Sequence, residues 1–280
     1  MAPADTGAPA APGTVGDLLA AATGRLAAAG VDTPRLDAEV LLAFVLGVDR
    51  ARLVIDRSAG LAAEAASRFE ALVARREARE PVAYITGRRA FRRIELAVDR
   101  RVLIPRPETE LLVEVGLELG SGARVVDVGT GSGAVALALK DERPDLRVSG
   151  ADVSFDAVAV ARANASSLGL DVRFVVADLM ADVFADAVLA NLPYVADAAS
   201  LPPEIARYEP PGALFAGRDG LDVIRRAVTA VSGPTVGLLA LEIGAEQAEA
   251  VSALMWDAGF GAVGVRNDLA GLARVVVGTA

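Results

Sequence analysis

The sequence contains no cysteine and no histidine, and aromatic residues make up only 4% of it. Without cysteine there is neither a disulfide framework nor a thiolate metal site. Without histidine the chain lacks the most common general base and the most common metal ligand, so we expect no metal site. Any catalysis must therefore use carboxylates, amides, hydroxyls or backbone groups.

Long apolar runs and a secretory signal are missing as well. No stretch approaches the length of a membrane-spanning helix, and the N-terminus lacks a basic segment followed by an apolar one. Residues 1–13 are rich in Ala, Pro and Gly, which is typical of a disordered leader. We therefore expect a cytoplasmic protein without a membrane partner. No heptad run indicates a dimer, so a monomer is the default.

The charge is acidic overall but unevenly distributed. The formal net charge of −9 disfavours sequence-blind binding to phosphate backbones, and we expect no stable nucleic-acid partner. Residues 75–106, however, contain ten arginines and only four acidic residues. A solvated helix end followed by a hairpin is the simpler interpretation. A surface that faces an anionic partner is the alternative.

Residues 14–80 show helical spacing and helix signals. Thr14 is a candidate N-cap with Asp17 as its capping-box partner, and Gly30 and Gly47 are typical stop signals. Pro34 fits the first turn of a second helix. We predict a small helical domain over these residues, whose own side chains indicate no chemistry.

The pattern changes to β-structure after Pro81. Alternating apolar residues at 94–98 and 102–104 predict a hairpin within a linker over 81–104. From 105 to 280, β-rich runs alternate with helical segments, which is typical of a parallel, doubly wound α/β sheet. The predicted strands are 123–129, 146–152, 172–178, 186–191 and 235–244, the helices are 134–142, 155–168, 220–232 and 245–258, and a terminal antiparallel pair covers 261–268 and 273–279.

A glycine-rich turn joins the first of these strands to a helix in "VVDVGTGSGAVALAL" (125–139). Glycines let the backbone pass close to a ligand and point amides at it from the helix N-terminus. Asp152 ends the next strand, where an acid typically accepts hydrogen bonds from ribose hydroxyls. The predicted cofactor-binding residues here are Gly129, Thr130, Gly131, Ser132, Gly133 and Asp152.

This turn also satisfies the dinucleotide pattern G-x-G-x-x-G/A. Two features favour S-adenosylmethionine instead. Hydride transfer needs a proton shuttle, and the only lysine, Lys140, lies within a predicted helix rather than at a strand end. The second feature is the tetrapeptide Asn191-Leu192-Pro193-Tyr194, which follows the fourth parallel strand.

The tetrapeptide suits methylation of a planar nitrogen. The Asn191 carboxamide oxygen and the Leu192 carbonyl can accept hydrogen bonds from a substrate NH₂ group. Pro193 stiffens the turn, and Tyr194 offers a flat face against a planar group. Two acceptors would orient the nitrogen toward a sulfonium methyl, so that orientation rather than a strong base supplies the catalysis.

Several segments together resemble the HemK/PrmC-type protein-(glutamine-N5) methyltransferases. "LIPRPETE" (103–110) closely matches the run that precedes the catalytic domain of that family, and "EPVAYITGRRAF" (80–91) is similar to its interdomain segment. "NLPYV" resembles its Asn-Pro-Pro-Tyr signature. "GRDGLDVIRR" (217–226) and "LEIGAEQ" (241–247) are similar to further family segments.

The resemblance implies a class I methyltransferase fold, a seven-stranded and mostly parallel sheet, with a small N-terminal helical domain that helps to dock the substrate. It implies transfer of a methyl group from S-adenosylmethionine to the glutamine of the Gly-Gly-Gln loop in class I peptide chain release factors. Asn191 would also contact the cofactor, Leu179 matches a position near the adenine, and Arg106 and Glu108 belong to a segment that shapes the substrate channel.

One departure leaves alternatives open. The family has proline where this chain has Leu192, although a backbone carbonyl is still present there. Asn-Leu-Pro-Tyr also resembles the signature of ribosomal RNA adenine-N6 dimethyltransferases, an interpretation that the arginines of 75–106 would support. A paralogue that methylates glutamine in another protein and a relative that only binds are the further alternatives.

Overall fold

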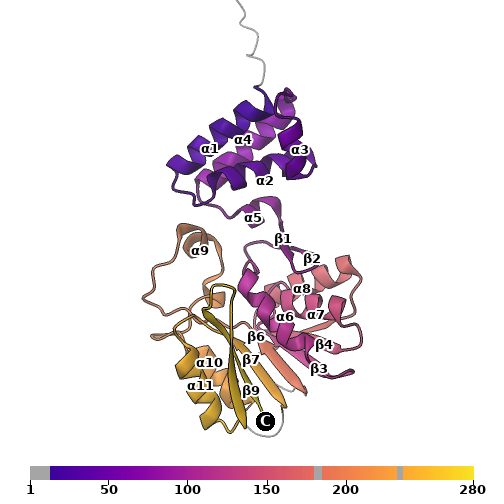
Figure 1. Ribbon diagram of the computed structural model, residues 1–280, viewed down its shortest axis with the longest axis vertical. Helices are drawn as coiled ribbons and strands as arrows, with labels where there is room; N and C mark the ends of the chain where they lie inside the picture. The colour runs from indigo at the N-terminus through magenta and orange to yellow at the C-terminus, as the bar shows by residue number, and fades with distance from the viewer. Residues whose placement is uncertain (1–12, 180–184, 232–235) are drawn as a thin grey trace, which may run out of the picture. The chain divides into compact units, whose positions relative to one another are not determined.

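The computed structural model describes residues 13–179, 185–231 and 236–280. Residues 1–12 of the predicted leader lie outside them, as do Ser232 and Thr235 at the ends of two predicted elements. The chain divides into two compact units, Met1–Thr86 and Gly87–Ala280, and each is described by itself (Figure 1).

The first unit is helical. Thr14 and Asp17 form the predicted capping box, because Thr14 Oγ1 accepts from Asp17 N at 3.2 Å and Asp17 Oδ2 accepts from Thr14 N at 3.0 Å. Gly30 and Gly47 follow two of the helices with φ of 74° and 65°, a region that favours glycine. The helices are α1 (Val15–Ala28), α2 (Pro34–Leu46), α3 (Arg50–Ile55), α4 (Ala63–Glu77) and α5 (Val82–Thr86).

Helices α1, α2 and α4 pack around one apolar core. Leu26, Leu41 and Phe69, one from each helix, are fully buried. Arg76 Nε donates to Asp37 Oδ2 at 2.7 Å, and both side chains are buried. Removing one partner would leave an unpaired charge in the interior, a loss of about 3–5 kcal/mol. This pair holds α4 against α2.

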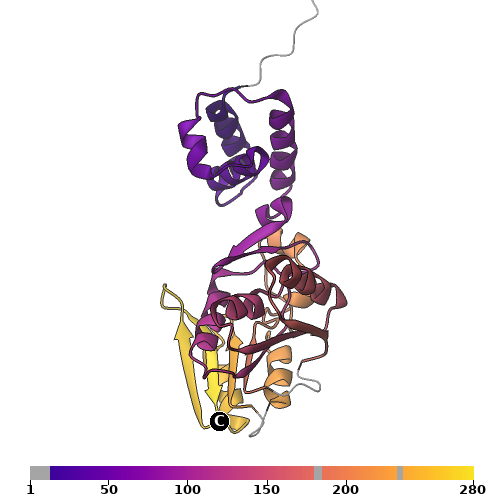
Figure 2. The same ribbon diagram turned by 90° about the vertical axis from the view of Figure 1, so that its right-hand side faces the viewer.

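A seven-stranded sheet forms the centre of the second unit, in the order β5-β4-β3-β6-β7-β9-β8. Strands β3 to β7 run parallel, and β9 is antiparallel to both β7 and β8. The predicted doubly wound sheet and its terminal antiparallel pair, at one edge in Figure 2, are confirmed. The strands are β3 (Arg124–Val128), β4 (Arg147–Asp152), β5 (Arg173–Val176), β6 (Ala187–Ala190), β7 (Leu238–Glu242), β8 (Ala262–Asn267) and β9 (Ala273–Thr279).

Helices cover both faces of this sheet (Figure 1). On one face α6, α7 and α8 contact the strands, while Ile224 of α10 and Met255 of α11 are fully buried against Leu239 and Leu241 on the other. This burial fixes which strand side chains face each layer of helices. The helices are η1 (Pro107–Thr109), α6 (Glu110–Leu117), α7 (Ala134–Glu142), α8 (Phe155–Leu168), α9 (Pro203–Tyr208), η2 (Pro211–Ala213), α10 (Asp222–Ala230) and α11 (Ala248–Asp257).

The predicted hairpin pairs differently from expectation. β1 (Arg88–Phe91) pairs antiparallel with β2 (Ile94–Ala97), and residues 102–104 form no strand. Arg92 has φ of 49°, so a two-residue turn follows Phe91 directly and returns the chain onto the basic segment before it. The alternation of Ile94 and Leu96 was informative, but Arg88 and Arg89 carry no apolar signal that would reveal the partner strand.

Candidate active site

The strand order of the sheet reverses between β3 and β6, and ligands of such folds bind beyond the carboxyl ends of the strands at that point. Val128 of β3 is the register partner of Ala190 of β6. The next residues, Gly129 and Asn191, therefore leave the sheet side by side. A Cβ on Gly129 would lie 3.2 Å from the Asn191 carbonyl oxygen, so only glycine fits there without a shift.

Backbone hydrogen bonds hold the glycine-rich turn against β4. Gly129 N and Thr130 N both donate to the Ala151 carbonyl, at 2.9 and 3.0 Å. A Cβ at Gly131 would meet no atom within 4 Å, whereas one at Gly133 would lie 2.9 Å from a methyl group of α7. Gly131 thus leaves space for a ligand, and Gly133 packs the turn onto the helix.

Thr130 and Ser132 brace this turn from inside the protein. Thr130 Oγ1 donates to Asp127 Oδ2 at 2.6 Å, and the same oxygen accepts from Ala136 N at 3.2 Å. Burial raises the pKa of Asp127 to about 7. Ser132 is buried, and its carbonyl accepts from Asn164 Nδ2 at 2.9 Å. Both predicted cofactor residues therefore lie behind the turn.

Asp152 is half-buried at the carboxyl end of β4. Its Oδ2 accepts from Gly131 N at 2.9 Å, and its Oδ1 accepts from Ser154 N at 2.9 Å. Burial raises the pKa of this carboxyl, and the two backbone hydrogen bonds act against that shift by favouring the ionised form. The carboxylate is fixed in place with lone pairs left to accept from ligand hydroxyls.

A cavity of about 380 Å³ opens at this edge of the sheet. It is lined by seven of the predicted site residues, together with segments that precede β3 and follow β4, β5 and β6. The predicted residues on its wall are Gly129, Gly131, Asp152, Leu179, Asn191, Leu192 and Pro193. Thr130, Ser132, Gly133, Tyr194, Arg106 and Glu108 are not on that wall.

Asn191 presents its carboxamide with a defined orientation. Its Nδ2 donates to the Thr109 hydroxyl oxygen at 3.0 Å, so the amide nitrogen is turned toward α6. Within the described part of the chain, neither Asn191 Oδ1 nor the Leu192 carbonyl accepts a hydrogen bond. Two adjacent acceptors are thus left beside the cavity.

The side chains that follow Asn191 anchor the turn. Leu192 is only 4% exposed and packs into the core between the sheet and α10, so this leucine has a buried site of its own. The Tyr194 hydroxyl donates to Glu242 Oε1 at 3.3 Å, and Gln247 Nε2 donates to the Tyr194 carbonyl at 3.0 Å. Burial, with the Glu242 carboxylate next, raises the pKa of Tyr194. The hydrogen bond to Glu242 therefore anchors the Tyr194 side chain to β7.

Arg106 and Glu108 lie in the segment that leads to α6. Arg106 pairs with the buried carboxylate of Glu209, N–O 2.5 Å, and Ile104 N donates to the other oxygen of Glu209 at 3.2 Å. Because Pro210 follows Glu209 and lines the cavity, this pair fixes the cavity wall. Glu108 is half-buried, and its charge opposes ionisation of Glu242.

No role was predicted from the sequence for Thr109, Glu209 or Glu242, although Thr109 and Glu242 lie within family-like segments. Thr109 and Glu209 act through partners that are 82 and 103 positions away, and no local pattern signals such contacts. Glu242 ends β7 as Asp152 ends β4. Glu242 could have been proposed as a site residue because it is an acid near the carboxyl end of the predicted strand 235–244.

Comparisons with known proteins place this geometry in a family. The PrmC N-terminal domain model matches residues 17–87, and the Methyltransferase small domain model matches residues 107–206. The chain is 42% identical to the release factor glutamine methyltransferase of Rhodospirillum rubrum, over 94% of this chain and 84% of that protein. It is 40% identical to the one of Deinococcus radiodurans, over 93% of this chain and 96% of that protein.

The chain belongs to the release factor glutamine methyltransferase family. The predicted family resemblance and the predicted methyltransferase class are confirmed. A solved methyltransferase from Pyrococcus furiosus shares the fold at 14% identity, with a TM-score of 0.51 over 76% of this chain and 98% of that one. The predicted class I methyltransferase fold with its helical N-terminal part is confirmed as well.

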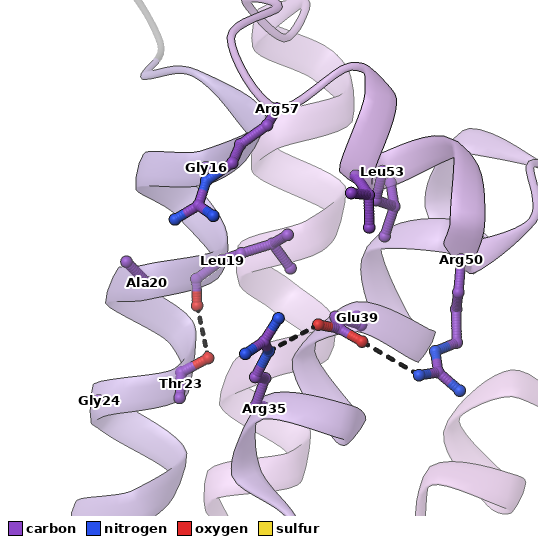
Figure 3. Close-up of a pocket in the computed structure, with 11 residues that line it drawn as sticks. Gly16, Leu19, Ala20, Thr23, Gly24, Arg35, Glu39, Arg50, Leu53 and Arg57 are labelled. Atoms are coloured by element: carbon purple, nitrogen blue, oxygen red, sulfur yellow. Dashed lines mark hydrogen bonds and ion pairs between the residues drawn. The ribbon is translucent and has the colours of Figure 1, made fainter.

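The helical unit of this family member has a cavity of its own, of about 480 Å³ (Figure 3). Its wall comes from α1, α2 and α3. Glu39 accepts from Arg35 Nε at 2.9 Å and from Arg50 at 3.1 Å, and Arg57 lies over Gly16. Three arginines and one glutamate line this cavity, which is therefore basic.

Most arginines of residues 75–106 are paired within their own unit. At least six of the ten have carboxylate partners: Arg75 with Glu80, Arg76 with Asp37, Arg88 with Glu95, Arg92 with Glu142, Arg101 with Asp99, and Arg106 with Glu209. This pairing favours the simpler interpretation of the charge run over a surface for an anionic partner.

No described helix has both the length and the apolar character to span a membrane. In the same part of the chain, no cluster of three or more Asp or Glu side chains is arranged to hold a metal ion.

Proposed function

We propose that this protein transfers a methyl group from S-adenosylmethionine to the side-chain amide nitrogen of the glutamine in the Gly-Gly-Gln motif of class I peptide chain release factors. One observation carries the proposal: Asn191 Oδ1 and the Leu192 carbonyl stand unpaired beside a cavity at the switch point of a methyltransferase sheet. The names of the relatives supply the substrate class.

The residues on the cavity wall fit S-adenosylmethionine. Gly131 leaves open space where a Cβ would stand, and Asp152 offers fixed acceptors to ribose hydroxyls. Leu179, with φ of 56°, places an apolar side chain on the same wall for a flat base. When bound, the cofactor supplies an electrophilic sulfonium methyl group.

The reacting glutamine amide is a weak nucleophile because its lone pair is delocalised. Two acceptors that take both hydrogens of the NH₂ group hold the nitrogen with one face toward the methyl donor. Asn191 Oδ1 and the Leu192 carbonyl supply these acceptors, and no side chain removes a proton before transfer. The proton that the nitrogen loses afterwards passes to solvent.

The test is transfer of labelled methyl groups from S-adenosylmethionine to a purified class I release factor. A release factor with the motif glutamine replaced by alanine is the matched control and should take no label. Label on ribosomal RNA instead would establish the adenine-N6 alternative, and label on another protein's glutamine would establish a paralogue. Cofactor binding by calorimetry without transfer to any of these would identify a binding-only relative.

We further propose that the helical domain, over residues 14–80, helps to dock the release factor. Support comes from the family match of this part and from α3, where Val54 and Ile55 are 72% and 73% exposed. Replacing both with aspartate should raise KM for the intact release factor and leave kcat unchanged. The same variant should treat a short Gly-Gly-Gln peptide as the wild type does, because a peptide is too short to reach this surface.

A further inference from the structure

Glu242 is a buried carboxylate that the reaction proposed above does not use. It ends β7 and is 1% exposed. Its Oε1 accepts from the Tyr194 hydroxyl, and its Oε2 is buried without a partner in the described part of the chain. A charged group kept in the interior with one oxygen unsatisfied is unfavourable for stability. Because this cost is retained beside Asn191 and Leu192, we expect a functional role of Glu242 in orienting them.

The unsatisfied oxygen has a matching donor nearby. Thr109 Oγ1 accepts from Asn191 Nδ2, so its own hydrogen must point elsewhere. Burial raises the pKa of Glu242, and a hydrogen bond from the Thr109 hydroxyl, which faces this carboxyl, acts against that rise. Within the described residues, the Thr109 hydroxyl donates to no other acceptor. The Thr109 hydroxyl thus links Glu242 of β7 to the Asn191 carboxamide by a chain of hydrogen bonds.

We propose that Glu242 is a positioning residue that sets the orientation of both Asn191 and Tyr194. The carboxylate takes the hydrogen of the Thr109 hydroxyl, which leaves the Thr109 lone pairs to receive Asn191 Nδ2. The amide of Asn191 is then held with its oxygen toward the cavity. The same carboxylate fixes the Tyr194 ring through its hydroxyl. This inference rests on the proposed function, because the orientation matters only if Asn191 Oδ1 receives a substrate hydrogen.

Protonation of Glu242 would reverse the chain. A carboxylic acid donates one hydrogen, and if the Thr109 oxygen accepts it, protonated Glu242 competes with the Asn191 amide for the lone pairs of that oxygen. Burial raises the pKa of Glu242 to about 7. Tyr194, Glu108 and Arg274 are the other titratable groups that face it, from the turn after β6, from η1 and from β9. Turnover should therefore fall as the pH drops below about 7.

The deciding variants are Glu242→Gln and Thr109→Val. Thr109→Val removes the hydroxyl, and Glu242→Gln replaces one acceptor oxygen with an NH₂ donor, so that Thr109 and Tyr194 can no longer both donate to residue 242. Each variant should lower kcat by about 10- to 100-fold, as loss of an outer hydrogen-bonding partner does at other sites. The double variant should be no worse than either single one, because both remove the same chain. Thr109→Ser keeps the hydroxyl and should retain kcat, and Glu118→Gln, an exposed glutamate in a surface ion pair, is the matched control.

Three readouts separate positioning from a merely structural role. Calorimetry should give an unchanged Kd for S-adenosylmethionine. Glu242→Gln should unfold no earlier than the wild type at pH 8, since it removes a buried charge. The fall of kcat below about pH 7 should disappear in Glu242→Gln. A variant that retains wild-type kcat and the same pH profile would overturn the proposal.

A readout without substrate distinguishes this inference from the proposed function. The side-chain amide protons of Asn191, assigned by their absence in Asn191→Ala, should exchange with solvent faster in Glu242→Gln and Thr109→Val than in the wild type. Unchanged exchange would overturn the positioning chain even if release factors are methylated. Faster exchange in a protein that methylates no release factor would uphold the chain and defeat the proposed function.

Discussion

The two halves of the sheet carry the two halves of the site, and they are built in opposite ways. On the β5-β4-β3 side, backbone amides and fixed carboxylates are satisfied within the protein, as Asp152 is by Gly131 and Ser154. On the β6-β7 side, Asn191 Oδ1 and the Leu192 carbonyl are left without donors. The half that would bind the cofactor is thus held in place by hydrogen bonds within the protein. The half that would orient the substrate keeps acceptors free for the hydrogens of the substrate.

Asn191→Ala tests the open half and has the largest expected effect. Removing one of the two acceptors should lower kcat by about 10²–10³-fold, by analogy with loss of an oxyanion-hole donor. The Kd for S-adenosylmethionine should change far less, because the cofactor is held mainly from β3 and β4. Single-turnover transfer to a release factor and calorimetry measure the two quantities. An unaltered kcat would remove the basis for assigning the substrate to this half.

Asp127→Asn probes the closed half through stability. The folded-state pKa of Asp127, about 7, lies above its ordinary value, so the folded protein keeps this proton to higher pH than the unfolded chain does. The wild type therefore loses stability from this group as the pH rises from about 4 to about 7, by up to about 4 kcal/mol. The free energy of unfolding of Asp127→Asn should not show this fall with pH. Above pH 7 the variant should therefore be more stable relative to the wild type than it is at pH 4.

Unfolding by denaturant at several pH values measures this difference. Asp171→Asn, at an exposed position on a loop, is the matched control and should follow the wild type. Since Asp127 braces the turn and does not line the cavity, its variant should keep the wild-type pH profile of kcat. A change in that profile would mean that the two halves are not separate.

Asp152→Ala should have the opposite pattern to Asn191→Ala: cofactor binding should weaken and kcat should change little. Loss of a fixed carboxylate acceptor should weaken S-adenosylmethionine binding by about 10- to 100-fold. At saturating cofactor, kcat should recover to within a few-fold of the wild type. If kcat stays low under saturation, Asp152 contributes to the orientation of the reacting groups and the assignment of the two halves fails.

Much of the closed half could be predicted from the sequence because its signals are local. Glycine spacing, a strand before it and an acid at the end of the next strand lie within one βαβ unit. The parallel doubly wound sheet and the place of Asn191 after its fourth strand followed from the alternation of strands and helices. The alternation did not reveal that β1 pairs with β2, because β1 begins with two arginines and has no apolar alternation.

The support of the open half could not be predicted, because it depends on tertiary contacts. Thr109 reaches Asn191 from a short 3₁₀ turn, and Arg106 meets Glu209 from a loop. Thr130 was expected at the cofactor on its place in the motif, yet its hydroxyl points to buried Asp127. Motif position indicates which segment lines a site, whereas the direction of each side chain depends on what is packed behind it.

Gly131→Ala gives the smallest expected effect and tests the closed half most finely. Its φ of 55° disfavours a side chain by about 1–2 kcal/mol, but a Cβ there would meet no atom within 4 Å. Folding stability should fall by about 1 kcal/mol, while the Kd for S-adenosylmethionine should rise if that open space is where the cofactor lies. Gly129→Ala, whose Cβ would press on Leu192 and the Asn191 carbonyl, should lower kcat as well. If Gly131→Ala binds the cofactor as tightly as the wild type, the cofactor does not pass over the glycine turn.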